Sequence, residues 1–150
     1  MSSNDRNKNT VQLRIRRTIP ASPERVFAAW TDPDALKKWW GPKGVRCLSA
    51  AIDLRVGGNY KIENELSDGT VLWIVGEFEV VEPPRLLVYT WSVGSKSSDP
   101  ERVTVRFEKH QQGTEIVLLH ELIPSDELRD QHQNGWYGCL DGLAEFLSEC

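Results

Sequence analysis

The sequence predicts an α+β fold in which a curved antiparallel sheet of about seven strands wraps around one long C-terminal helix. From Val45 to Glu121 apolar and polar residues alternate, and turn-forming residues interrupt the alternation at short intervals. This pattern is typical of antiparallel strands. From Leu128 to Leu147 apolar residues recur every three or four positions, which is typical of an amphipathic helix. One face of such a sheet must be covered, and only this helix is long enough to cover it.

The N-terminal region predicts a tail and then a first strand. The first ten residues are polar throughout, so we expect residues 1–10 to be a disordered tail and residues 11–150 to be a single domain. Apolar residues alternate partly over Val11–Ile19, which predicts a strand that ends before Pro20.

Two short helices are expected between this strand and the next. Ser22 precedes Pro23, and Asp32 precedes Pro33. Each pair combines an N-cap residue with proline at the first helical position. Glycine and proline at positions 41–42 end the second helix.

The remaining elements are six strands and the long helix. The third of these strands exceeds the common strand length, so we expect a bulge or bend near Gly76. The long helix opens at residues 124–127 and contains Gly135, Gly138 and Gly142, each about 1 kcal/mol worse than alanine in a helix. Close packing against the sheet, or the need to leave room for bulky rings elsewhere, would explain them. The expected strands are Val45–Asp53, Asn59–Glu65, Val71–Val81, Leu86–Ser92, Arg102–His110 and Glu115–His120.

Composition excludes several classes of protein. The formal net charge of -4 gives no basic surface for nucleic acid, and no apolar run is long enough to be a membrane span. The N-terminus lacks the apolar core of a secretory signal, so we expect a cytoplasmic protein. Cys47, Cys139 and Cys150 are widely spaced, so we expect reduced thiols, with the first two in the core.

Five ordered motifs resemble proteins similar to the activator of the ninety-kilodalton heat-shock chaperone ATPase. This group belongs to the START-like (SRPBCC), helix-grip superfamily, and the resemblance spans about residues 11 to 148. It implies a helix-grip fold with a cavity between the sheet and the C-terminal helix. Only the C-terminal domain of the eukaryotic activator is resembled, so the chaperone role is not carried over. The motifs lie at residues 27–42, 53–58, 83–91, 119–121 and 134–136.

The candidate ligand-binding residues are large or polar side chains expected to face this cavity. Trp40 ends the helix pair and Trp136 faces inward on the long helix. His120 shares its face of a strand with apolar residues, and His132 lies one helical turn before Trp136. Two histidines without a third ligand are a poor zinc site, so no metal, cofactor or catalytic set is expected. The full set is Trp40, Tyr60, Ile62, Phe78, His120, His132, Trp136 and Leu140.

Parity alone does not place two other tryptophans, Trp73 and Trp91. Regular alternation places Trp73 and Trp91 opposite Phe78 and Leu86, unless a bulge changes the register. Exposed there, they would be covered by a second subunit or a partner. Three strand carboxylates, Asp53, Glu63 and Glu77, are expected to point to solvent.

The leading hypothesis is a small cytoplasmic helix-grip protein, monomeric or weakly dimeric, that binds a hydrophobic or aromatic small molecule between sheet and helix. A second hypothesis is a protein-interaction module, such as a chaperone co-factor, with Trp73 or Trp91 accessible. A third is an enzyme of the cyclase or aromatase type, which requires an inward polar set such as His120 with Tyr60.

Overall fold

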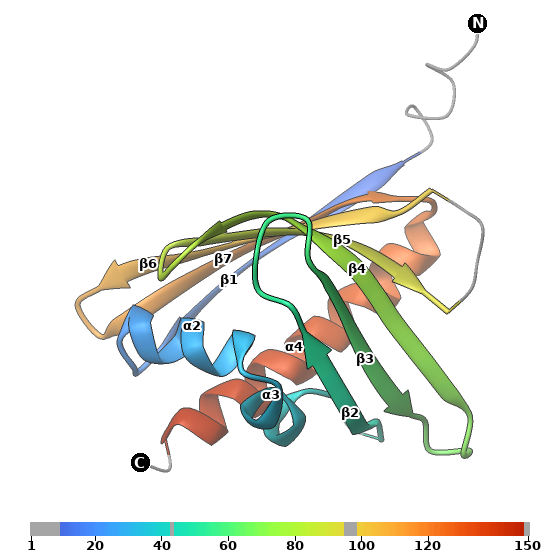
Figure 1. The fold of residues 1–150 in the computed structure, drawn as a ribbon, viewed down its shortest axis with the longest axis horizontal. Coiled ribbons are helices and arrows are strands. Elements are labelled where there is room, and N and C mark those ends of the chain that lie inside the picture. Colours follow the sequence, from blue (N-terminus) through green and yellow to red (C-terminus); the bar gives the residue numbers. More distant parts are fainter. Residues whose placement is uncertain (1–9, 43, 95–98, 149–150) are drawn as a thin grey trace, which may run out of the picture.

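A computed structural model of the chain describes residues 10–42, 44–94 and 99–148. The expected tail lies outside these residues except for Thr10, as does Cys150. The expected seven antiparallel strands form one sheet (Figure 1). Their order in it is β1-β7-β6-β5-β4-β3-β2. The strands are β1 (Val11–Ile19), β2 (Arg46–Ile52), β3 (Asn59–Glu65), β4 (Val71–Glu82), β5 (Leu86–Val93), β6 (Glu101–His110) and β7 (Gly113–Ile123).

Two short helices, α2 (Pro23–Thr31) and α3 (Pro33–Trp39), lie between β1 and β2, as predicted. The Ser22 hydroxyl caps α2 by accepting a hydrogen bond from the Arg25 N–H at 3.3 Å. The Asp32 carboxylate caps α3 in the same way. Because these caps satisfy backbone donors that have no partner within the helix, each helix begins where the sequence places it.

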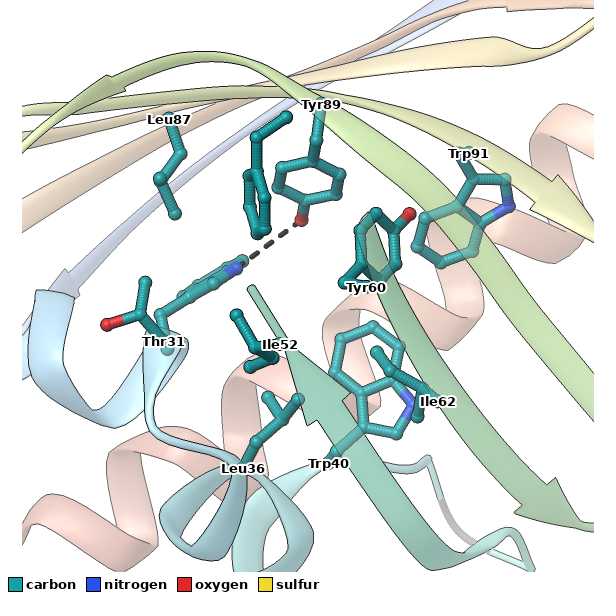
Figure 2. A pocket seen from close by; sticks show the side chains of 11 residues that line it. Thr31, Leu36, Trp40, Ile52, Tyr60, Ile62, Leu87, Tyr89 and Trp91 are labelled. Carbon is teal, nitrogen blue, oxygen red and sulfur yellow. Dashed lines mark hydrogen bonds between the residues drawn. The ribbon is translucent and has the colours of Figure 1, made fainter. Parts of the chain in front are cut away.

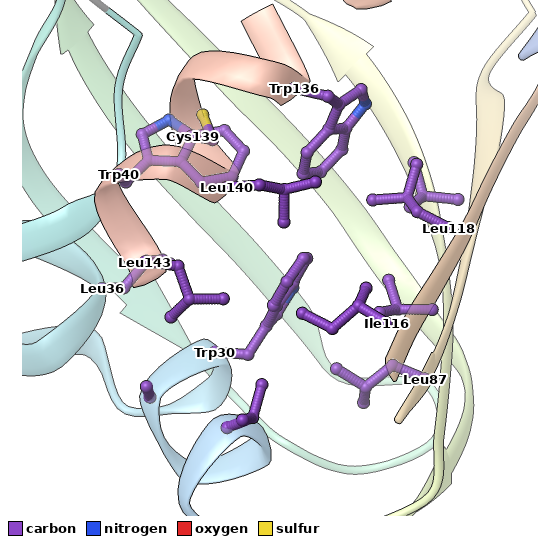
Figure 3. Close-up of a cluster of buried hydrophobic side chains, with 14 of the residues drawn as sticks. Trp30, Leu36, Trp40, Leu87, Ile116, Leu118, Trp136, Cys139, Leu140 and Leu143 are labelled. Carbon is purple, nitrogen blue, oxygen red and sulfur yellow. The ribbon is translucent and has the colours of Figure 1, made fainter. Parts of the chain in front are cut away.

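The long helix α4 (Asp126–Ser148) crosses the concave face of the sheet, and α2 and α3 lie on the same side (Figure 1). The core is the layer between α4 and the sheet. Leucine and isoleucine from both sides meet there, including Leu87, Ile116, Leu140 and Leu143, all fully buried (Figure 3). Each such side chain contributes about 1.5–3 kcal/mol by burial. None of the described helices is long and apolar enough to cross a membrane.

Two glycines mark places where backbones approach closely. A Cβ atom on Gly142 of α4 would lie 2.5 Å from the carbonyl oxygen of Trp39, so glycine lets α4 meet the end of α3. On β4, a Cβ atom on Gly76 would lie 2.0 Å from the Thr90 carbonyl oxygen. The β4–β5 register shifts just after Phe78, which agrees with the bulge expected near Gly76. Gly135 of α4 has nothing within 4 Å of such an atom, so close packing does not explain it.

Trp91 lies on the core face, and not on the outer face that regular alternation would give it. The core face of β5 carries Leu87, Tyr89 and Trp91, and Trp91 is only 6% exposed. Leu86, at the start of the strand, is half-buried and belongs to the outer face. Taking it as a core residue therefore assigned Trp91 to the wrong face. Trp73 does lie on the outer face, half-buried, with the Lys61 ammonium 5.1 Å from the centre of its ring.

Candidate functional site

Three tryptophans from three elements meet under the sheet and form what we call the indole cluster: Trp40, Trp91 and Trp136. The Trp136 ring is 2% exposed, and its centroid lies 5.5 Å from each of the other two. Trp40 and Trp91 are 6.2 Å apart. Trp136 and Trp40 meet edge to face, a favourable arrangement of aromatic rings.

One side of this cluster borders a small cavity, the inner pocket, between β2–β5 and the α2–α3 pair (Figure 2). Its free volume is about 30 Å³, which suffices for one or two water molecules. Two buried tyrosines occupy its polar positions: the Tyr60 hydroxyl donates to the Thr90 carbonyl at 2.6 Å, and the Tyr89 hydroxyl accepts from Trp30. The lining residues are Trp30, Thr31, Leu36, Trp40, Ile52, Tyr60, Ile62, Phe78, Leu87, Tyr89 and Trp91.

The other side borders a larger cavity, the α4 pocket, between α4 and strands β3, β4 and β5. It has a volume of about 190 Å³. An apolar cavity of about 150 Å³ is known to hold benzene, so this volume accepts an aromatic ring with substituents or two fused rings. Its lining residues are Trp40, Pro42, Val45, Asn64, Leu66, Leu72, Ile74, Trp91, Val93, Gln131, His132, Gly135, Trp136 and Cys139.

Two residues that line the α4 pocket each have a buried polar atom that makes no hydrogen bond with any described residue. These atoms are the Oδ1 oxygen of Asn64, which is 4% exposed, and the Nε1 nitrogen of Trp91. Asn64 shares the inward face of β3 with Tyr60 and Ile62. A buried polar atom without a partner costs about 1–3 kcal/mol, so such atoms are rare. One of the two atoms is an acceptor and the other a donor, and both are buried beneath the pocket surface.

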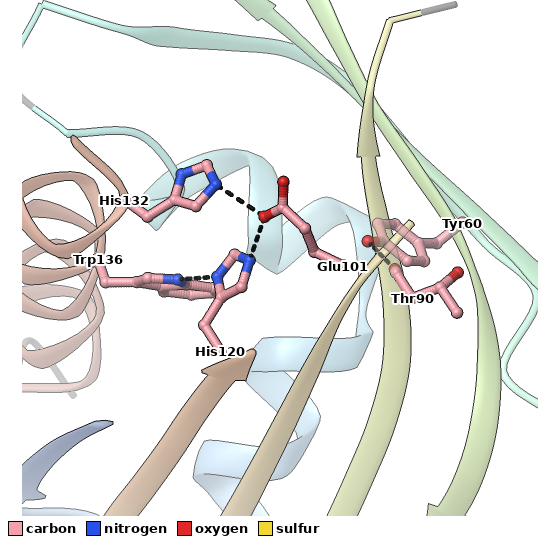
Figure 4. Close-up of polar contacts among 6 residues, drawn as sticks. All are labelled: Tyr60, Thr90, Glu101, His120, His132 and Trp136. Atoms are coloured by element: carbon pink, nitrogen blue, oxygen red, sulfur yellow. Dashed lines mark hydrogen bonds and ion pairs between the residues drawn. The ribbon is translucent and has the colours of Figure 1, made fainter. Parts of the chain in front are cut away.

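Beside the pocket, His120 and His132 both contact the same carboxylate oxygen of Glu101 (Figure 4). Oε1 of Glu101 lies 2.7 Å from Nε2 of His120 and 2.9 Å from Nε2 of His132. The two imidazole rings are stacked, with centroids 4.5 Å apart. Burial opposes ionisation of Glu101, but the hydrogen bonds from the two histidines outweigh it and lower the pKa of this carboxyl. Glu101 is therefore a carboxylate at neutral pH.

Trp136 determines which nitrogen of His120 carries the proton. The indole N–H can only donate, and it lies 3.0 Å from Nδ1 of His120. Nδ1 is therefore unprotonated, and the proton resides on Nε2, which donates to Glu101. Burial lowers the pKa of His120, against the opposing effect of the Glu101 hydrogen bond. His120 is a neutral imidazole with both nitrogens engaged.

The same three residues have ligand atoms within 4.8 Å of one another, close enough for a metal ion. The sequence argument that the histidines lack a third ligand was therefore incomplete. One feature nevertheless opposes a metal. Nε2 of His120 could bind one only if the proton moved to Nδ1, which faces the Trp136 donor instead of the acceptor that a metal-bound histidine needs.

Comparison with known proteins identifies the fold and its relatives. Residues 20–148 match the family described as Activator of Hsp90 ATPase homolog 1-like protein. The chain belongs to this family. It is similar to a crystal structure from Chromobacterium violaceum, at 30% identity with a TM-score of 0.82 over 92% of this chain and 96% of the other.

Two further members of the Activator of Hsp90 ATPase homolog 1-like family are also similar. The AHSA1 protein of Silicibacter pomeroyi is 26% identical, with a TM-score of 0.82 over 92% of this chain and 98% of that one. The AHSA1-like protein of Aeromonas hydrophila is 26% identical, with a TM-score of 0.79 over 93% of each chain. No curated protein matches the chain significantly. The relatives support the family and the helix-grip fold without assigning a ligand.

The eight candidate residues do not line a single cavity in this family member. Tyr60, Ile62 and Phe78 line the inner pocket, and His132 and Trp136 line the α4 pocket. Trp40 lines both. His120 and Leu140 are fully buried and line neither pocket. His120 nevertheless contacts two residues that line the α4 pocket, because it accepts a hydrogen bond from Trp136 and stacks on His132.

Three polar or aromatic residues of the site were missed, and alternation could have found each of them. Glu101 shares the inward face of β6 with Val103 and Val105, but the expected strand began one residue later. Asn64 has the same parity as the inward residues of β3, and Trp91 the same parity as those of β5. Among the carboxylates considered instead, Asp53 and Glu77 are exposed and Glu63 is half-buried, bonded to the Ser49 hydroxyl.

Proposed function

We propose that this protein binds a hydrophobic or aromatic small molecule in the α4 pocket, within the cytoplasm and without catalysing a reaction on it. The observation that carries this proposal is a cavity of about 190 Å³ walled by the indole cluster of Trp40, Trp91 and Trp136. Concave sites of this kind, mostly apolar with a few polar groups, are typical of small-molecule sites. The size of the cavity favours a ring system of one or two rings over a long lipid chain.

The surroundings of the pocket favour binding over catalysis. Glu101 and Trp136 engage both ring nitrogens of His120, so this histidine has no free group for a ligand. Cys139, the thiol in the pocket wall, is buried, which raises its pKa to about 12 and keeps it protonated and unreactive. The interaction-module hypothesis required Trp73 or Trp91 to be accessible. Trp91 is buried, and Trp73 is half-buried on the outer face of the sheet.

A pocket-filling variant tests the proposal. Gly135 lines the α4 pocket and has free space where a side chain would go, so Gly135→Leu fills the cavity from the helix while improving helix propensity. The control is Asn134→Leu, which adds a leucine on an exposed position of the same helix. The probe is naphthalene, and binding is measured by saturation-transfer NMR and by thermal shift.

We expect naphthalene to bind the wild type and Asn134→Leu and to lose binding in Gly135→Leu, with the variant folded at least as stably. Absence of binding to the wild type, or equal binding to both variants, would contradict the proposal.

A further inference from the structure

Glu101 determines which nitrogen of His132 carries the proton. Nε2 of this histidine lies 2.9 Å from Oε1 of Glu101, and a carboxylate can only accept a hydrogen bond. When the ring is neutral, Nε2 therefore carries the proton and Nδ1 keeps its lone pair. Nδ1 lies on the side of the ring away from Glu101 (Figure 4). Because the carboxylate polarises the imidazole through Nε2–H, Nδ1 becomes a stronger acceptor.

Nδ1 of His132 is open to the α4 pocket. His132 lines this pocket, and 11% of its side chain is exposed. His120 covers one face of the ring, with the two centroids 4.5 Å apart. Nδ1 makes no hydrogen bond with any described residue, yet the buried atoms without a partner in this part of the chain are those of Asn64 and Trp91. Nδ1 is therefore both unpaired and accessible.

Other acceptors are scarce among the side chains of the pocket wall. The indole cluster can only donate hydrogen bonds, and Oδ1 of Asn64 is buried beneath the pocket surface. Gln131 is exposed, so water already serves its amide oxygen. Nδ1 of His132 is therefore the main side-chain acceptor that a ligand inside the pocket meets.

We propose that the ligand of the α4 pocket is an uncharged aromatic molecule with an N–H or O–H group, which donates a hydrogen bond to Nδ1 of His132. This inference rests on the proposed function and specifies its ligand. The aromatic part would pack against the indole cluster, in which the Trp91 ring lies 5.8 Å from the His132 ring. An apolar ligand of the same shape would cover Nδ1 without replacing the water that serves it, so it should bind about tenfold or more weakly.

Charged ligands fit the surroundings of His132 less well. An anion without a donor group would set its lone pairs against that of Nδ1, with the Glu101 carboxylate at the far edge of the same ring. A cation would be buried without a carboxylate in contact, because no Asp or Glu is among the described residues that line the cavity. An uncharged donor avoids both costs.

The experiment compares two probes of nearly the same shape, indole and indene, in which the N–H of one is replaced by the CH₂ of the other. Dissociation constants are measured by NMR titration of the wild type, His132→Gln and the control His110→Gln. Glutamine at position 132 removes Nδ1, but its amide N–H can still donate to Glu101 in the place of Nε2–H. His110 ends β6 and lies outside the α4 pocket. The ¹⁵N signal of Nδ1, assigned from His132→Gln, reports directly on the hydrogen bond.

We expect indole to bind about tenfold or more tightly than indene to the wild type and to His110→Gln, and the two to bind within about threefold of each other in His132→Gln. The Nδ1 signal of His132 should move upfield with indole and stay in place with indene. The ratio and the signal in the wild type test the inference whatever the stability of His132→Gln.

Several outcomes would overturn the inference. Equal binding of both probes to the wild type, or an Nδ1 signal that indole leaves unchanged, refutes it and leaves the proposed function standing. A preference for indole that persists in His132→Gln assigns the hydrogen bond to another group and also refutes it. If both probes fail to bind while naphthalene binds, the inference alone is wrong; if all three fail, the proposed function is wrong as well.

Discussion

Glu101 holds two buried imidazoles, and replacing it is the most direct test of how the site is built. In Glu101→Ala, Nε2 of His120 and Nε2 of His132 both lose their acceptor. The two histidine side chains are 0% and 11% exposed, so water replaces that acceptor poorly. At about 1–3 kcal/mol for each buried donor left unpaired, the free energy of unfolding should fall by about 2–6 kcal/mol.

A conservative variant and a surface control separate the cause of this loss. Glu101→Gln keeps an oxygen that can accept both hydrogen bonds, without the charge that strengthens them, so it should cost only about 1–2 kcal/mol. Glu65→Ala removes a carboxylate that pairs with Arg46 at 2.8 Å, but the Arg46 side chain is 74% exposed. Such a pair contributes about 0–1 kcal/mol.

The assay is urea unfolding followed by tryptophan fluorescence, with the free energy taken from the midpoint and slope of each transition. The expected order of destabilisation is Glu101→Ala, then Glu101→Gln, then Glu65→Ala. If Glu101→Ala and Glu65→Ala prove equally stable, the shared carboxylate does not hold the site together and the reasoning fails.

Three further outcomes are expected. Gly142→Ala should lower the melting temperature because its methyl group meets backbone of α3, whereas Gly135→Ala on the same helix should gain about 1 kcal/mol. Because the pKa of His120 is lowered in the folded protein, the unfolded chain binds its proton first. The free energy of unfolding should therefore fall as pH drops below about 6.5, by at most about 1.4 kcal/mol per pH unit. This part of the pH dependence should vanish in His120→Asn and remain in His110→Asn, as urea unfolding at several pH values would show. Finally, excess Zn²⁺ should leave the melting temperature of the wild type unchanged, because the His120 proton faces Glu101; a clear rise would contradict that proton assignment.

The sequence predicted the fold because its local signals agree with one another. Caps at Ser22 and Asp32 fixed the two short helices, and alternation with turns fixed seven strands in nearly their observed bounds. The expected bounds were least accurate at β7, which extends over Gly113–Ile123 where Glu115–His120 was expected. Ends of strands carry weak patterns because pairing, more than side-chain polarity, determines where they stop.

The site was less predictable because it depends on which face of each strand is inward. Parity assigns residues to two faces without saying which one meets α4, and Trp91 was misplaced for that reason. The Glu101 contacts join residues 19 and 31 positions apart, from β6, β7 and α4. No spacing rule in the sequence relates those positions, so only the assembled sheet brings them together.

The strand order has a consequence for how the chain folds as it is synthesised. β1 pairs only with β7. Val11 therefore cannot pair until Ile123 has been synthesised, more than two-thirds of the chain later. Strands β2 to β6 each have a sequence neighbour beside them and can pair as they emerge. The first strand made is therefore among the last to be joined, together with the helix that completes the pocket. A ribosome-bound chain truncated before β7 would hold most of the sheet but neither the Glu101 contacts nor the cavity.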